Sequence, residues 1–143
     1  MLEAITAMAS VIGDPYLLML IAVTTVLGIV IGVLPGLGAT TGAALLLPFT
    51  LTMSPVNAIA VLATLYVSAT FAGSITAILI NTPGTSAAAA TTFDGFPLAQ
   101  RGEAGRALGI AVVSSTIGGI FSIIVLCLAA PLLARVAYEF RPP

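Results

Sequence analysis

Two stretches of this sequence, each with a Pro-Gly pair between apolar segments, decide how the chain can fold. They read Gly32-Val33-Leu34-Pro35-Gly36-Leu37-Gly38-Ala39-Thr40-Thr41-Gly42 and Ile80-Asn81-Thr82-Pro83-Gly84-Thr85-Ser86. Each is followed by a segment shorter than the roughly 20 apolar residues that a helix needs to cross a bilayer. Irregular backbone at membrane depth is tolerated only where protein buries it or where it lines a water-filled cavity. The two stretches therefore predict broken helices inside a membrane-embedded fold.

The composition of the chain indicates that the lipid bilayer is its solvent. Of 143 residues, 59% are hydrophobic and 6% are charged, whereas an ordinary soluble domain has about 25% charged residues. Residues 15–93 and 107–134 contain no charged side chain. A soluble domain of this size could not bury so much apolar surface, because small domains leave a large share of their surface exposed. We therefore expect an all-α fold, a polytopic membrane helical bundle with Pro-Gly-broken or re-entrant half-helices.

The residue inventory excludes several classes of site. The chain has no His, no Lys and a single Cys. A His/Cys zinc site, a Ser-His-Asp triad, a Schiff-base lysine and an intramolecular disulfide are therefore excluded, and an enzyme is the least favoured class. Four basic residues at a net charge of −1 form no basic patch, so nucleic acid is not an expected partner. We expect no metal centre and no cofactor.

The positions of Pro and Gly divide the apolar sequence into five segments within one membrane domain, residues 1–143. Three segments are long enough to cross the bilayer, at about 16–34, 56–80 and 103–130, and two are short, at about 37–47 and 85–92. Pro48 and Pro131 are expected to end the segments before them, because proline lacks the N–H that a helix needs. Asp94-Gly95 is a turn signal, so residues 94–106 are predicted to form a polar loop.

The charges near the two ends of the chain leave its orientation in the membrane open. Met1–Asp14 carries two acidic residues and no basic residue. It lacks the basic region of a secretory signal peptide, so we expect an interfacial helix there. Two arginines flank one end of the last span and two flank the other, at positions 101, 106, 135 and 141. The positive-inside rule therefore selects neither orientation.

Small and hydroxyl residues follow regular patterns inside the apolar segments. Glycines recur at four-residue spacing at Gly28, Gly32 and Gly36, at Gly38 and Gly42, and at Gly105 and Gly109. This spacing lets a neighbouring backbone approach closely, so it predicts tight helix packing. Segment 56–80 also contains Thr64, Ser68, Thr70, Ser74 and Thr76. These hydroxyls either line a wet cavity or donate back to carbonyls of their own helix.

The two Pro-Gly stretches have the features of a binding site for small ions. At a broken helix, the free N–H groups of a half-helix attract an anion, and unwound carbonyls coordinate a cation. Simple kinks between ordinary helices are the alternative, whereas a nucleotide P-loop is excluded because its lysine is missing. Asp94 either binds a coupling ion or proton or only marks the membrane edge. The candidate substrate and ion path consists of Pro35, Gly36, Gly38, Thr40, Thr41, Asn81, Thr82, Pro83, Gly84, Thr85 and Ser86.

Three motifs of the chain occur together in one protein family. They are GVLPGLG at 32–38, INTPG at 80–84, and DGFPLA at 94–99 followed by RGEAGRALG at 101–109. In this order and spacing they resemble the large membrane subunit of tripartite tricarboxylate transporters, the TctA family. The resemblance implies a multi-pass secondary transporter of the bacterial inner membrane, a symporter for citrate or related di- and tricarboxylates, coupled to Na⁺ or H⁺. It also implies a small membrane subunit and a periplasmic solute-binding protein as partners.

The resemblance covers only the N-terminal part of the family's much longer chains. We therefore expect this chain to be a truncated or split product, with half of a site. Two other functions stay open on the residues alone. One is a non-transporting membrane scaffold or assembly subunit whose Pro-Gly stretches are kinks. The other is a self-assembling oligomeric pore that packs through its glycine faces.

Overall fold

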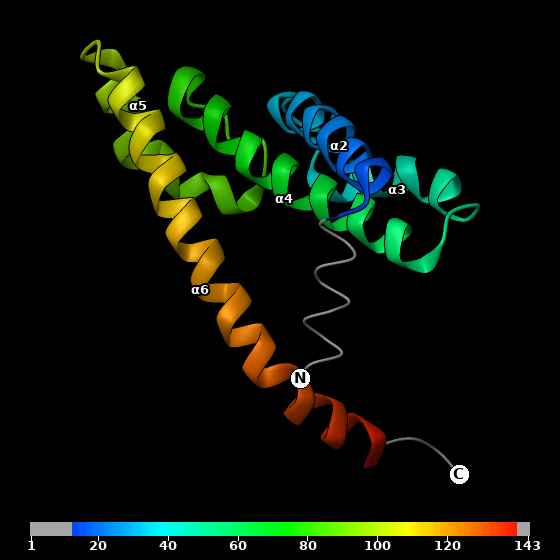
Figure 1. The fold of residues 1–143 in the computed structure, drawn as a ribbon. Helices are drawn as coiled ribbons and strands as arrows, with labels where there is room; N and C mark the ends of the chain where they lie inside the picture. Colours follow the sequence, from blue (N-terminus) through cyan, green and yellow to red (C-terminus); the bar gives the residue numbers. More distant parts are fainter. Residues whose placement is uncertain (1–12, 140–143) are drawn as a thin grey trace. The chain divides into compact units, whose positions relative to one another are not determined.

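The computed structural model describes residues 13–139, which are helical apart from short connections (Figure 1). The elements are α2 (Pro15–Val33), α3 (Ala39–Thr50), α4 (Pro55–Ile80), the 3₁₀ helix η1 (Ser86–Ala90), α5 (Thr91–Gln100) and α6 (Ala104–Glu139). The predicted all-α fold class is thus confirmed for the described residues. The interfacial helix predicted for Met1–Asp14 lies, apart from its last two residues, outside the described part of the chain.

Helix α2 begins and ends where its sequence provides a cap and a proline. The Asp14 carboxylate accepts a hydrogen bond from the Tyr16 backbone N–H at 2.9 Å, and Pro15 occupies the first helical position. The helix stops at Val33 because Leu34, which precedes Pro35, adopts an extended conformation with φ −80° and ψ 112°. A proline disfavours the helical region for the residue before it.

Helix α4 follows the same rules over a longer span. Ser54 caps its N-terminus by accepting from the Asn57 N–H at 3.4 Å, and Pro55 is its first residue. At the other end Asn81 adopts the left-handed conformation, with φ 56°. Asparagine tolerates this conformation better than most residues, and a left-handed residue is a common way to end a helix.

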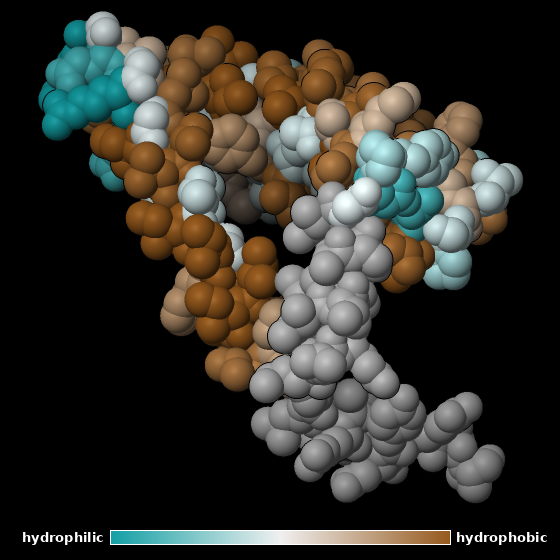
Figure 2. Space-filling model, in the orientation of Figure 1, coloured by the Kyte–Doolittle hydropathy of each residue, from teal (hydrophilic) through white to brown (hydrophobic). Residues whose placement is uncertain are grey.

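Helix α4 is the central element of the part of the chain that ends at Ala107. It contacts α2, α3, η1 and α5, and Figure 1 shows α2 lying beside it. The fully buried large side chains are Leu17, Leu65 and Ile78, whereas most other buried residues on α4 are small. Because its buried face consists mainly of small side chains, neighbouring backbones can approach α4 closely. Apolar residues also cover most of the visible surface of the helices. Hydrophilic residues gather in two places, one near the turn between α5 and α6 and one on the right of the view (Figure 2).

Three helical segments are long and apolar enough to cross a membrane. They are Pro15–Val33, Pro55–Ile80 and Ala104–Ala130, so this is a multi-pass membrane protein. The 12 residues of α3 are about 18 Å long at 1.5 Å per residue, short of the roughly 30 Å of a bilayer core. The chain divides into two compact units, up to Ala107 and from Leu108 onward, and the second consists mainly of α6. That residues 1–143 form one membrane domain stays a prediction.

The predicted polar loop at 94–106 is wrong over most of its length. Asp94, Gly95 and Pro97 lie inside α5, so only residues 101–103 connect α5 to α6. Gly95 is buried, and a Cβ added there would lie 2.7 Å from Ile78 Cγ1. The Asp-Gly turn signal is therefore overridden by tertiary packing, because the glycine lets α5 approach α4.

The true end of α5 is a Schellman motif around Gly102. Its φ is +82°, its N–H donates to the Ala99 carbonyl at 3.0 Å, and the Glu103 N–H donates to the Leu98 carbonyl at 3.0 Å. Glycine at the position after the cap favours this ending, because it adopts a positive φ without steric cost. Gly102 was therefore a better stop signal than Gly95.

Neither Pro48 nor Pro131 ends its helix, contrary to the prediction. Pro48 is the tenth of the 12 residues of α3. The buried Thr50 hydroxyl donates to the Leu47 carbonyl at 2.8 Å, which stabilises the last turn beyond the proline. The backbone of α6 continues through Pro131 to Glu139. A proline removes one helical hydrogen bond, and long apolar helices tolerate that loss.

Candidate functional site

The first Pro-Gly stretch forms a tight, exposed turn between α2 and α3. The Leu37 N–H donates to the Leu34 carbonyl at 3.1 Å. Gly36 has φ +90°, and no atom of the described residues lies within 4 Å of a Cβ added there, so its backbone conformation, not space, requires glycine. Pro35 and Gly36 are exposed, as are Thr40 and Thr41 in the first turn of α3, whereas Gly38, the N-cap residue, is half-buried.

The second Pro-Gly stretch folds back onto α4. The N–H groups of Asn81 and Thr82 both donate to the Thr76 carbonyl, the latter at 3.4 Å. The Gly84 N–H then donates to the Gly73 carbonyl at 3.3 Å. Gly84 is buried, and Asn81, Thr82, Pro83 and Ser86 are exposed. The stretch is therefore anchored to its own helix through backbone groups.

The two stretches meet, although they lie far apart in the sequence. A Cβ added to Gly84 would lie 2.5 Å from the Gly32 carbonyl oxygen and 2.8 Å from the Gly73 Cα. The end of α2, the C-terminal half of α4 and the second break are thus in backbone contact at one point. Glycine is required at 84 because no side chain fits between these backbones.

The glycine face of α2 makes this contact possible. A Cβ on Gly32 would overlap the Ala69 backbone of α4, and one on Gly28 would overlap the Ser68 hydroxyl. Gly42 of α3 is also buried and faces Ile31 of α2, with a Cβ position 3.1 Å from Ile31 Cγ2. Gly105 and Gly109, by contrast, have no atom of the described residues within 4 Å of an added Cβ.

Gly73 was not singled out from the sequence, although a signal for it existed. Ala69, Gly73 and Ala77 repeat at four-residue spacing, the same pattern that marks the glycine face of α2. All three residues are buried. A search for small residues of any type, rather than for glycine, would have found this face of α4.

Thr85 lies at the meeting point with an unpartnered hydroxyl. Its Oγ1 is buried and has no hydrogen-bond partner among the described residues. A Cβ on Gly73 would lie 3.0 Å from both the Oγ1 and the backbone nitrogen of Thr85. The neighbouring Thr76 hydroxyl instead donates to the Gly73 carbonyl at 3.1 Å. Asp94 is exposed in the first turn of α5, away from any charged partner in the described residues.

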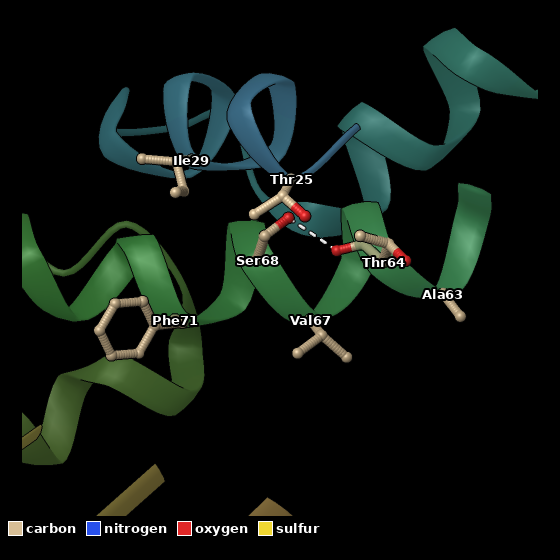
Figure 3. Close-up of a pocket in the computed structure, with 7 residues that line it drawn as sticks. All are labelled: Thr25, Ile29, Ala63, Thr64, Val67, Ser68 and Phe71. Atoms are coloured by element: carbon tan, nitrogen blue, oxygen red, sulfur yellow. Dashed lines mark hydrogen bonds between the residues drawn. The ribbon is translucent and has the colours of Figure 1, made fainter. Parts of the chain in front are cut away.

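The hydroxyls on α4 mostly bond within their own helix. Ser68 donates to the Thr64 carbonyl at 2.7 Å, and Thr70 donates to the Tyr66 carbonyl at 2.7 Å. Figure 3 shows the Ser68 bond at a groove of about 450 Å³ lined by Thr25, Ile29, Ala63, Thr64, Val67, Ser68 and Phe71. Since Thr25 also donates to its own helix, at the Ile21 carbonyl, the groove offers few free polar groups. Of the two interpretations of these hydroxyls, the structure favours intrahelical bonding.

We expect Thr70→Val to leave the stability of the chain nearly unchanged. The Thr70 hydroxyl donates to the Tyr66 carbonyl of its own helix, so its removal breaks no hydrogen bond between helices. The free energy of unfolding of the variant in detergent should lie within about 0.5 kcal/mol of that of the parent, as for other substitutions away from the packed core. A loss of more than about 2 kcal/mol would instead mean that the hydroxyl makes a bond beyond its own helix.

The two Pro-Gly stretches present neutral polar groups, and residues 32–42 and 73–86 contain no charged side chain. The described residues contain no group of three or more His, Cys, Asp or Glu side chains that could hold a metal.

Residues 18–143 match the family described as "Tripartite tricarboxylate transporter TctA family". The chain belongs to the TctA family. TctA is a membrane-bound transporter family and not an enzyme family, which confirms the sequence-based resemblance and the expectation that this is not an enzyme.

One curated relative is similar to this TctA-family chain. It is an Agrobacterium vitis protein described as "Uncharacterized 52.8 kDa protein in TAR-I ttuC' 3'region", 46% identical over 121 residues. The alignment covers 85% of this chain and 24% of the relative. The chain therefore spans about a quarter of that protein's length. No solved structure matches the present chain.

Proposed function

We propose that this chain forms part of the membrane component of a secondary transporter for citrate or related di- and tricarboxylates. The observation that carries the proposal is the contact between the two Pro-Gly stretches, where Gly84 lies against the Gly32 carbonyl and Gly73. Many secondary transporters bind their substrate and coupling ion at broken helices, where irregular backbone at membrane depth exposes N–H and C=O groups. Two breaks that meet supply such groups at one place. Two independent kinks would have no reason to meet.

The substrate path runs along the two stretches in this proposal. Pro35, Gly36 and Gly38 shape the first turn, and Thr40 and Thr41 present exposed hydroxyls at the start of α3. Asn81, Thr82, Pro83 and Ser86 form the exposed part of the second stretch. Neutral donors of this kind bind carboxylates without a buried lysine or arginine, and α3 and η1 act as re-entrant half-helices.

The proposed transporter works in the bacterial inner membrane with two partners. A periplasmic solute-binding protein delivers the carboxylate, and a small membrane subunit completes the complex. The process is symport with Na⁺ or H⁺. Because the chain spans about a quarter of its relative, it supplies only some of the groups that surround the substrate.

The test compares the full-length transporter with the isolated chain. Proteoliposomes that hold the full-length protein and its small subunit, with the solute-binding protein outside, should accumulate radiolabelled citrate under an ion gradient. The 143-residue chain alone should show no citrate binding by calorimetry, because part of the site is missing. Absence of uptake of every di- and tricarboxylate tested would favour a scaffold, and carboxylate-independent leakage of ions from the isolated chain would favour a pore.

A further inference from the structure

Two buried polar groups at the meeting point have no hydrogen-bond partner among the described residues. The first is the Thr85 hydroxyl. The second is the carbonyl of Gly32, to which no N–H or O–H of the described residues donates. In an uninterrupted helix it would accept from the residue four positions on, but the chain turns away at Pro35 and Gly36 has φ +90°. Buried polar groups are normally satisfied, so each exception indicates a missing partner such as a water or an ion.

The oxygen atoms of these two groups favour an electron-poor partner, even though the Thr85 backbone nitrogen also lies at this point. A backbone carbonyl only accepts, and a threonine hydroxyl accepts as well as it donates. The Thr76 hydroxyl oxygen lies close by, 3.4 Å from the position of an added Gly84 Cβ. A carboxylate would be repelled by the Gly32 carbonyl, whereas a hard cation is coordinated by such oxygens.

The charge and type of that cation follow from the residues at the two stretches. Residues 32–42 and 73–86 contain no Asp, Glu, His, Lys or Tyr, so no side chain there can carry a proton. Ca²⁺ and Mg²⁺ sites normally include carboxylates, and the Asp94 carboxylate is exposed on α5. Among ions, a monovalent metal cation held by neutral oxygens therefore fits these residues best.

We propose that the Gly32 carbonyl and the Thr85 hydroxyl coordinate a monovalent cation, Na⁺ or a close analogue, which couples to carboxylate transport. The inference rests on the proposed function and assigns the coupling ion to this point of the fold. Access of the cation to these oxygens requires a shift of the loop at Gly84, because Gly84 packs against the Gly32 carbonyl. A single backbone hydrogen bond, the 3.3 Å bond from Gly84 to the Gly73 carbonyl, holds the loop at that residue.

Cation binding is tested first without transport. Binding of ²²Na⁺ to the detergent-solubilised full-length transporter should be saturable, and Thr85→Val should weaken it about tenfold, the effect expected for one lost bond to a charged group. Thr85→Ser keeps the oxygen and should restore the affinity. Thr92→Val is the matched control, because the Thr92 hydroxyl already donates to the Ala89 carbonyl at 2.7 Å. It should bind Na⁺ like the parent protein.

The transport assay then separates the cation site from the substrate site. Thr85→Val should raise the Na⁺ concentration for half-maximal citrate uptake about tenfold, with the citrate KM at saturating Na⁺ little changed. Failure of citrate uptake in the parent protein, with ²²Na⁺ binding retained and sensitive to Thr85→Val, would overturn the citrate function and keep the cation site. No ²²Na⁺ binding by the parent, or equal binding by Thr85→Val, would overturn the cation site and leave a buried water as the partner.

Discussion

Gly84→Ala, made in a full-length transporter that carries this sequence, is expected to reduce carboxylate uptake to background. The added methyl group would lie 2.5 Å from the Gly32 carbonyl oxygen and 2.8 Å from the Gly73 Cα. Both are backbone atoms, so neither can move aside as a side chain could. Overpacking of this kind costs roughly 3 kcal/mol, or about 100-fold in the population of the competent arrangement. The two Pro-Gly stretches would separate, and their polar groups would no longer converge.

The measurement is radiolabelled citrate uptake, with the amount of inserted protein determined in the same membranes. Gly118→Ala is the matched control, because no atom of the described residues lies within 4 Å of a Cβ added there. It should transport normally, and both variants should insert to the level of the parent protein. Uptake by Gly84→Ala within about twofold of the parent would mean that contact between the stretches is not needed for transport.

Gly32→Ala is expected to destabilise the packing of α2 on α4 in the 143-residue chain itself. The added Cβ would overlap the carbonyl oxygen, the Cα and the carbonyl carbon of Ala69. Since the helices meet here backbone to backbone, they must move apart, and burial around Leu65 and Ala69 is lost along the crossing. We expect a loss of roughly 3 kcal/mol, which corresponds to an apparent Tm lower by about 10 °C.

Size-exclusion profiles of heated, detergent-solubilised protein measure this effect. Gly105→Ala provides the control, because an added Cβ there meets no described atom, and alanine favours the helix over glycine by about 1 kcal/mol. Its apparent Tm should stay the same or rise. An unchanged Tm for Gly32→Ala would show that α2 and α4 do not cross at this glycine in the membrane protein.

The positions of most helices and of both breaks could be predicted from the sequence, because they depend on neighbouring residues in the chain. Apolar runs of 19 and 26 residues became α2 and α4, since only a helix satisfies its own backbone groups in lipid. Pro35 and Pro83 lack an N–H and restrict the residue before them, so each break follows from its own neighbours. The errors at Pro48, Gly95 and Pro131 arose where such a local signal was weaker than the rest of the helix or its packing.

The amino-acid sequence by itself determined the class of the molecule: a membrane protein, the two breaks, the glycine spacing of α2 and the family motifs. These depend on residue type and on spacing along the chain. Only the tertiary structure decided that Gly84 lies against Gly32 and Gly73, that the Thr85 hydroxyl is buried without a partner among the described residues, and that Gly95 lies in a helix against Ile78. Each of these depends on how two helices cross, and the crossing is set by the combined shape of many side chains.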